Sequence, residues 1–200
     1  MRTITINNSE IKIACNALTY MYYRKIFNKN IFDDIDTVRD FLLLQLGSDN
    51  LDIENETLET ITLKLNSYIE ALNRLTYVAI YTNNQDIEDY TKWIEKNEIL
   101  EQENDCIATI IEEIVDCFID EKVSEELKRI NKGSGDDTEV LFPEHFFLSA
   151  CLRLGLTIED LKTLTYIDVM KIFLSTTREK KKKEKVRKAT QADWDRLAGG

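Results

Sequence analysis

The stretch LETITLKLNSYIEALNRLTYVA, residues 58–79, decides the expected fold of this chain. Its apolar side chains recur every three or four residues: Leu58, Ile61, Leu65, Ile69, Leu72, Leu75 and Ala79. This spacing places them on one face of a helix of about six turns. A helix of that length with one apolar stripe needs packing partners, so we expect a mainly α-helical protein built around it.

The residues before this stretch predict a hairpin and two helices. Residues 2–13 alternate between apolar and polar side chains around a central turn, which indicates a small β-hairpin that rests on helices. The period then becomes helical over residues 16–28. A second helix is expected to start at Asp36 or Thr37, which can cap it, and to end at Gly47.

The residues after this stretch predict a short helix and a long one. Asn83-Asn84 ends the central helix, and the short helix that follows carries Trp93 as a core residue. The long helix is capped by Asn104 or Asp105 and is expected to continue to Ile130, because isoleucines recur along it at helical spacing.

The sequence Gly133-Ser134-Gly135-Asp136-Asp137 is the expected linker between two parts of the chain. Residues 1–132 carry 26 acidic and 14 basic side chains and form the expected acidic helical body, whereas residues 138–200 form a short helical module with a lysine-rich segment and a partly flexible tail. The excess of carboxylates repels nucleic acid and anionic membranes and favours basic partners.

The residue types needed for catalysis or metal binding are scarce. The chain has four cysteines without a C-x-x-C pair, and His145 is its only histidine. It has no glycine-rich phosphate loop and no G-x-S-x-G motif. We therefore expect neither an enzyme nor a cofactor or metal site. The sequence also lacks a signal peptide and an apolar run of bilayer length, so we expect a cytoplasmic protein with no membrane partner.

The candidate partner-binding residues lie in the C-terminal part. They are Phe146 and Phe147, the lysines Lys180, Lys181, Lys182 and Lys183, and the apolar pair Trp194 and Leu197. The lysine run is a solvated linker, a docking arm for an acidic partner, or a phosphate contact. Trp194 has polar neighbours near a chain end, where a tryptophan is either docked on a partner or packed locally.

The opening of the chain resembles the start of the tail assembly chaperones of long-tailed phages and prophages. In that family a hairpin precedes a helix with a Tyr-Arg … Phe-Gly-Lys-Asp-Ile type of ending, and here Asn28 and Asn30 replace the glycine and the aspartate. The resemblance is carried by Ile4-Thr5-Ile6-Asn7, Ile11-Lys12-Ile13, Ala17-Leu18 and the run from Tyr22 to Ile35.

The C-terminal part resembles the downstream half of the same chaperone system, which many phages join to the upstream half by programmed ribosomal frameshifting. The matching segments are Phe146-Phe147-Leu148, the run from Leu154 to Leu161, Leu164-Thr165 and the run from Arg187 to Asp195. Trp194 departs from the smaller or phenylalanine-like residue expected there.

The resemblance implies a non-catalytic role in virion assembly in the host cytoplasm. The body would bind the long helical tape measure protein, the C-terminal module would recruit tail tube subunits, and self-association is a further expectation.

Two other classes of function remain open at this point. One is a helical regulatory adaptor whose lysine-rich segment contacts nucleic acid, although nucleic acid is not the expected partner. The other is a small metal-assisted hydrolase, which would require carboxylates to converge.

Overall fold

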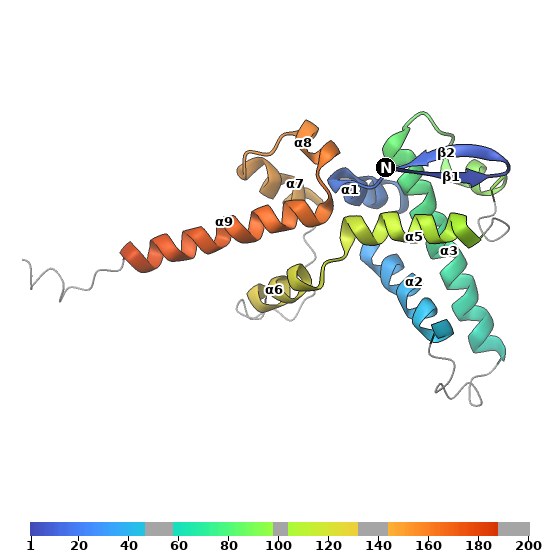
Figure 1. Cartoon of the computed structure of the whole chain (residues 1–200), viewed down its shortest axis with the longest axis horizontal. Coiled ribbons are helices and arrows are strands. Elements are labelled where there is room, and N and C mark those ends of the chain that lie inside the picture. The colour runs from blue at the N-terminus through green and yellow to red at the C-terminus, as the bar shows by residue number, and fades with distance from the viewer. Residues whose placement is uncertain (47–57, 98–103, 132–143, 188–200) are drawn as a thin grey trace, which may run out of the picture. The chain divides into compact units, whose positions relative to one another are not determined.

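The computed structural model describes residues 1–46, 58–97, 104–131 and 144–187 (Figure 1). It is mainly helical with an N-terminal two-stranded antiparallel hairpin, which confirms the expected fold class. The elements are β1 (Arg2–Ile6), β2 (Ser9–Ile13), α1 (Ala17–Phe27), α2 (Ile31–Leu46), α3 (Leu58–Asn83), α4 (Tyr90–Ile94), α5 (Asn104–Phe118), α6 (Glu121–Asn131), α7 (Glu144–Arg153), α8 (Ile158–Thr163) and α9 (Tyr166–Arg187).

The hairpin forms where the alternating pattern predicted it. Asn7 and Asn8 adopt positive φ angles of 50° and 60°, as a two-residue turn between right-twisted strands requires. One face of the hairpin, with Ile4, Ile6 and Ile13, is buried. The residue after β2 extends this docking, because the Ala14 N–H donates to the Ala79 carbonyl of α3 at 3.1 Å.

The helix α1 begins and ends at asparagines. The Asn16 side chain accepts a hydrogen bond from the Leu18 N–H at 2.9 Å, and the Thr19 hydroxyl accepts one from the Asn16 N–H at 2.9 Å. At the other end, Asn28 takes the left-handed conformation with a φ of 51°. Both boundaries agree with the expected helix over residues 16–28.

The predicted start of the second helix is wrong. The helix α2 begins at Ile31 rather than at Asp36 or Thr37, because the Asn30 side chain already accepts a hydrogen bond from the Phe32 N–H at 3.3 Å. Ile31 and Ile35 are both buried, so the apolar stripe of the helix starts one turn earlier than the capping residues suggested.

The long helix expected to run to Ile130 is two helices. The Ile119 N–H still donates to the Val115 carbonyl at 2.9 Å, but the chain leaves the helix there and begins α6 at Glu121. The two helices belong to different compact units. The first unit comprises Met1–Asp120 with Ile158–Ile167, and the second comprises the described parts of Glu121–Thr157 and Asp168–Gly200.

The short helix α8 packs in the first unit, against α1. The Ala17 N–H donates to the Leu164 carbonyl at 2.8 Å, and the Asn16 side chain donates to the Lys162 carbonyl at 3.1 Å. The ring of Tyr166 lies 5.5 Å from that of Tyr20. The expected linker at 133–137 lies outside the described residues, so the division at that point stays a prediction. The docking of residues 158–167 on α1 was not foreseen.

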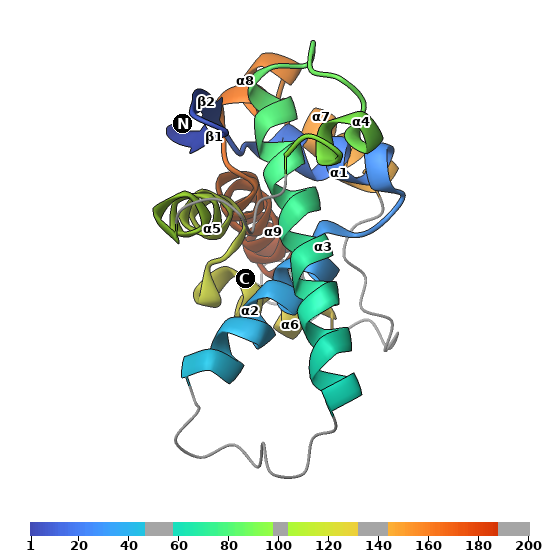
Figure 2. The same ribbon diagram turned by 90° about the vertical axis from the view of Figure 1, so that its right-hand side faces the viewer.

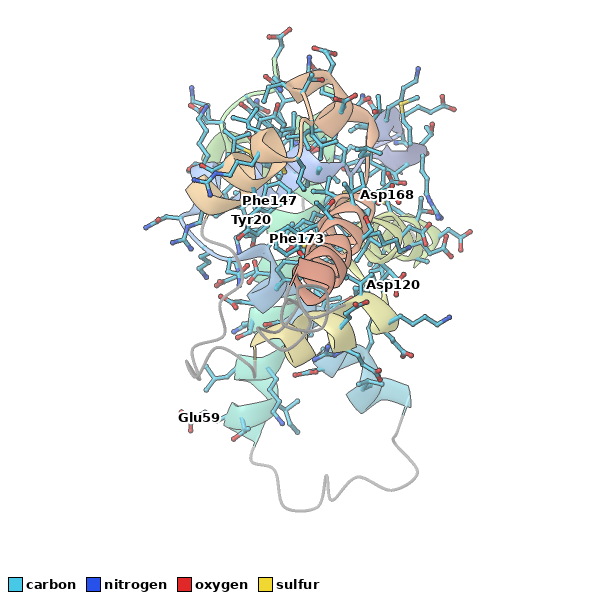
Figure 3. All side chains as sticks on the ribbon, turned by 90° about the vertical axis from the view of Figure 1, so that its left-hand side faces the viewer. Tyr20, Glu59, Asp120, Phe147, Asp168 and Phe173 are labelled. Carbon is cyan, nitrogen blue, oxygen red and sulfur yellow. The ribbon has the colours of Figure 1, made fainter. Side chains whose placement is uncertain are left out.

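The second unit has a small core of its own. Its buried side chains include Phe147 and Cys151 from α7 and Val169 and Met170 from α9. Phe147 and Phe173 line the same narrow space (Figure 3). Gly155 has a φ of 82° and ends α7, with the Leu156 N–H bonded to the Cys151 carbonyl at 3.0 Å, as in a Schellman motif.

Aromatic side chains fill the space between α1, α3 and α4. The Tyr77 ring lies 5.2 Å from Tyr90 and 5.5 Å from Trp93, and Trp93 is buried as expected. Burial raises the pKa of Tyr68, Tyr77 and Tyr90 above the ordinary tyrosine value.

Among the described helices, none is long and apolar enough to cross a membrane.

We predict that the free energy of unfolding falls as the pH rises above about 10, the pKa of tyrosine in an unfolded chain. The folded pKa values are higher, so the stability from these tyrosines is complete below that pH and is lost as the pH rises through the folded values. Urea unfolding between pH 8 and pH 11 should show the loss, and Tyr90→Phe should reduce it. A free energy of unfolding that stays constant to pH 11 would contradict the prediction.

Candidate functional site

The described part of the first unit contains an apolar groove between three helices. Figure 2 shows α2 parting from α3 toward its C-terminal end, and α5, seen nearly end-on, lies across α3 rather than along it. The groove has a volume of about 140 Å³. Its lining comes from α2 (Ile35, Val38, Arg39, Leu42, Leu43), α3 (Leu72, Leu75), α5 (Ile110, Ile111, Ile114, Val115) and Ile119.

The groove has a buried floor and an exposed apolar rim. Leu72, Leu75 and Ile110 form the floor and are almost fully buried. Three rim residues are large and apolar yet open to solvent: Leu43 is 58% exposed, Val115 39% and Ile119 37%. Exposed apolar side chains that are contiguous with an apolar floor are typical of a docking surface rather than of a finished core.

A wider depression on the other side of α2 is less suited to an apolar ligand. It has a volume of about 680 Å³, but its walls alternate polar and apolar groups such as Thr37, Asp40, Lys64 and Ser67 beside Phe41 and Leu63. The depression is therefore an open gap between diverging helices, and the narrower groove is the better candidate site.

A buried ion pair holds α2 against α3 and so maintains one wall of the groove. The Arg74 guanidinium donates to both carboxylate oxygens of Asp34, at 2.5 Å from Nε and 2.9 Å from Nη2. Burial opposes the charge on Arg74, but the hydrogen bonds and the charge of Asp34 outweigh it and raise the pKa of Arg74. A bidentate pair of this kind fixes the relative orientation of the two side chains in addition to neutralising their charges.

The Tyr23 hydroxyl completes this cluster from α1. It donates a hydrogen bond to Asp34, and the Tyr23 side chain is fully buried. Burial and then the neighbouring Asp34 carboxylate raise the pKa of Tyr23, so this tyrosine stays protonated as a donor. Three helices therefore meet at one carboxylate.

A second ionic cluster positions α5 against the hairpin. The Arg2 side chain donates to Glu112, and it contacts Asp116 at 2.6 Å and Glu113 at 3.3 Å. The Glu113 carboxylate also accepts the Cys15 N–H at 2.9 Å and lies 3.5 Å from the terminal amine of Met1. The hydrogen bond to Glu112 raises the pKa of Arg2. This cluster sets the second wall of the groove.

The metal-ligating and nucleophilic side chains of the described residues are few and shielded. Within residues 1–46, 58–97, 104–131 and 144–187, no three His, Cys, Asp or Glu side chains converge as a metal site. Burial raises the pKa of the Cys106 thiol and raises that of Cys151 to about 11, which keeps both thiols protonated and poorly nucleophilic at neutral pH. Asp34, Asp36 and Glu113 on α2 and α5 are held in ion pairs.

Of the predicted partner-binding residues, the structure describes the side chain of Phe147 alone. Phe147 is 1% exposed and packs inside the second unit. Phe146 lies in α7 and Lys180, Lys181, Lys182 and Lys183 lie in α9, but their side chains are outside the description, as are Trp194 and Leu197 entirely. The partner-binding role of these residues stays a prediction.

Sequence reasoning predicted a long apolar helix here but did not predict the groove. A signal was present: Ile107, Ile110, Ile111, Ile114, Val115 and Phe118 occupy more of the helix circumference than a single buried stripe needs. A helix that packs on one neighbour leaves part of so wide a stripe uncovered.

No family model, curated protein or solved structure matches this chain. The groove and the sequence resemblance therefore provide the basis for a function.

We predict that Asp34→Ala lowers the free energy of unfolding by about 3 kcal/mol, since it leaves the largely buried Arg74 guanidinium with only the exposed carboxylate of Glu70. Asp36→Ala on the same helix is the matched control, because its exposed pair with Arg39 contributes less than about 1 kcal/mol. Urea unfolding followed by circular dichroism measures both. Equal losses for the two variants would contradict the assigned role of Asp34.

Proposed function

We propose that this protein is a non-catalytic tail assembly chaperone whose groove between α2, α3 and α5 binds apolar helical segments of a tape measure protein. The observation that carries the proposal is the exposed apolar rim over an apolar floor. A long helical protein that awaits assembly exposes similar surface, and a groove of this kind covers an amphipathic helix along one face.

The sequence resemblance supports the same reading. The residues that carry its N-terminal part form the hairpin, α1 and the first turn of α2. These are the elements that hold the groove walls through Tyr23, Asp34 and Arg2. A client held there is shielded from aggregation, while the acidic surface of the chaperone keeps copies of the complex apart.

The proposal extends to the C-terminal residues, which would recruit tail tube subunits to the bound tape measure protein in the host cytoplasm. Its support is the C-terminal resemblance together with the change in charge after residue 132. A basic segment beside an acidic body can attract an acidic subunit without binding the body itself.

We predict that Leu43→Asp abolishes co-purification of the cognate tape measure protein and lowers its soluble yield on co-expression. A charge on the rim would have to be desolvated by the client, which an apolar helix cannot compensate. Leu152→Asp is a closely matched control, because Leu152 on α7 is 56% exposed and Leu43 is 58% exposed.

Both substitutions replace exposed side chains, so each should change the free energy of unfolding by less than about 0.5 kcal/mol. Circular dichroism and urea unfolding check this. Wild-type recovery of the tape measure protein by Leu43→Asp, or equal loss with Leu152→Asp, would refute docking at the groove.

We predict that Trp194→Ala weakens tube-protein binding more than neutralising any one of Lys180–Lys183 does. An aromatic anchor loses buried area, whereas one exposed ion pair is worth less than about 1 kcal/mol. Titration calorimetry with purified tube protein measures the difference. Removal of residues 178–200 should abolish this binding and spare tape measure binding, since it leaves α8 and the rest of the first unit intact. Unchanged tube binding after that removal would contradict the assignment.

A further inference from the structure

We propose that the groove selects amphipathic helices whose apolar face is flanked by lysine or arginine. This inference rests on the proposed function and adds the charge of the segment that the groove accepts. The charged side chains of α2 and α5, which carry the rims of the groove, support this inference.

No carboxylate is among the described residues that line the groove, but the charged side chains of the two helices that carry its rims are mostly acidic. The helices α2 and α5 together have eight acidic side chains and one basic side chain, Arg39. Arg39 lines the groove and is shared by two carboxylates, Asp36 at 2.8 Å and Asp40 at 3.2 Å. Asp36 and Asp40 outnumber Arg39, so this stretch of α2 keeps a net negative charge, with Asp36 near the groove and Asp40 on the side of the wider depression.

The α5 wall has the same imbalance. The carboxylates of Glu112, Glu113 and Asp116 share the Arg2 guanidinium and the terminal amine of Met1. The side chains of Glu112 and Asp116 are 63% and 69% exposed, and each directly follows a groove-lining residue, Ile111 or Val115. Glu112 is next to Val115 on the helix surface, whereas Asp116 lies further round α5 with Arg2, so a helix in the groove passes Asp36 on one side and Glu112 on the other.

The groove also limits the length of the segment. Its lining on the α5 side runs from Ile111 through Val115 to Ile119, which are four residues apart along the chain. That stretch corresponds to about 12 Å of helix axis, so the occupant needs at least about two turns with apolar residues at helical spacing. Cations on either side of that face would reach the two rims, because lysine and arginine extend along apolar surface to a charged partner.

The test uses two fluorescent helical peptides with the same leucine and alanine face, one with lysine and one with glutamate at the flanking positions. Binding to the full-length protein is followed by anisotropy at ionic strengths of about 0.01 M and about 0.15 M, where the Debye length is about 30 Å and about 8 Å. We expect the lysine peptide to bind at least about tenfold more tightly at the lower ionic strength, with a smaller preference at the higher one.

Two double variants show whether the peptide preference depends on charges near the groove or on the net charge of the protein. Asp36→Asn with Asp40→Asn leaves Arg39 uncompensated at the rim and should reduce the preference for the lysine peptide by about threefold or more. Asp86→Asn with Asp89→Asn changes the net charge equally at exposed positions that do not line the groove, and it should leave the preference unchanged.

The outcomes distinguish this inference from the function on which it rests. Equal binding of both peptides that Leu43→Asp abolishes would overturn the charge selection and retain the apolar docking site. A stronger affinity for the glutamate peptide, or an equal effect of the two double variants, would also overturn it. Binding of neither peptide would count against the docking site as well.

Discussion

The ion pair between Asp34 and Arg74 is the constraint on which the position of α2 depends. It joins two helices that diverge beyond it, and Tyr23 ties α1 to the same carboxylate. A buried pair of this kind contributes little net free energy compared with apolar packing, yet loss of one partner is costly. Its consequence here is geometric: α2 is fixed at its first turns, while its later residues stand apart from α5 and leave Leu43 exposed.

Local signals made much of the fold predictable. The turn at Asn7 and Asn8, the caps at Asn16 and Asn28 and the helix α3 each depend on a few neighbouring residues, and the structure has all of them. The apolar stripe of α3 is buried only toward its C-terminal end, since Ile61 and Leu65 are exposed. The two errors have different causes. The helix α2 starts early because Asn30 caps it locally, and Ile31 and Ile35 are buried in the turn that this adds. The helix expected to run to Ile130 ends at Phe118, and the residues beyond Asp120 pack in another unit.

The candidate site was not predictable in the same way. Apolar periodicity shows that Ile111, Val115 and Ile119 share a face, but it does not show whether another helix covers that face. Cover depends on where α2 lies, and that position is set by a contact between residues forty positions apart in the chain. The acidic composition was visible in the sequence, whereas its distribution along two walls of one groove required the structure.

The charges and the apolar rim have to be considered together. An exposed apolar rim favours association with any apolar surface, including a second copy of the same chain. The carboxylates of α2 and α5 oppose that second outcome, because two identical acidic rims repel each other at the distances where apolar contact begins. They do not oppose a client whose flanks are basic. Under the proposed function, the same side chains would keep the groove open between clients and distinguish a client from another copy of the protein.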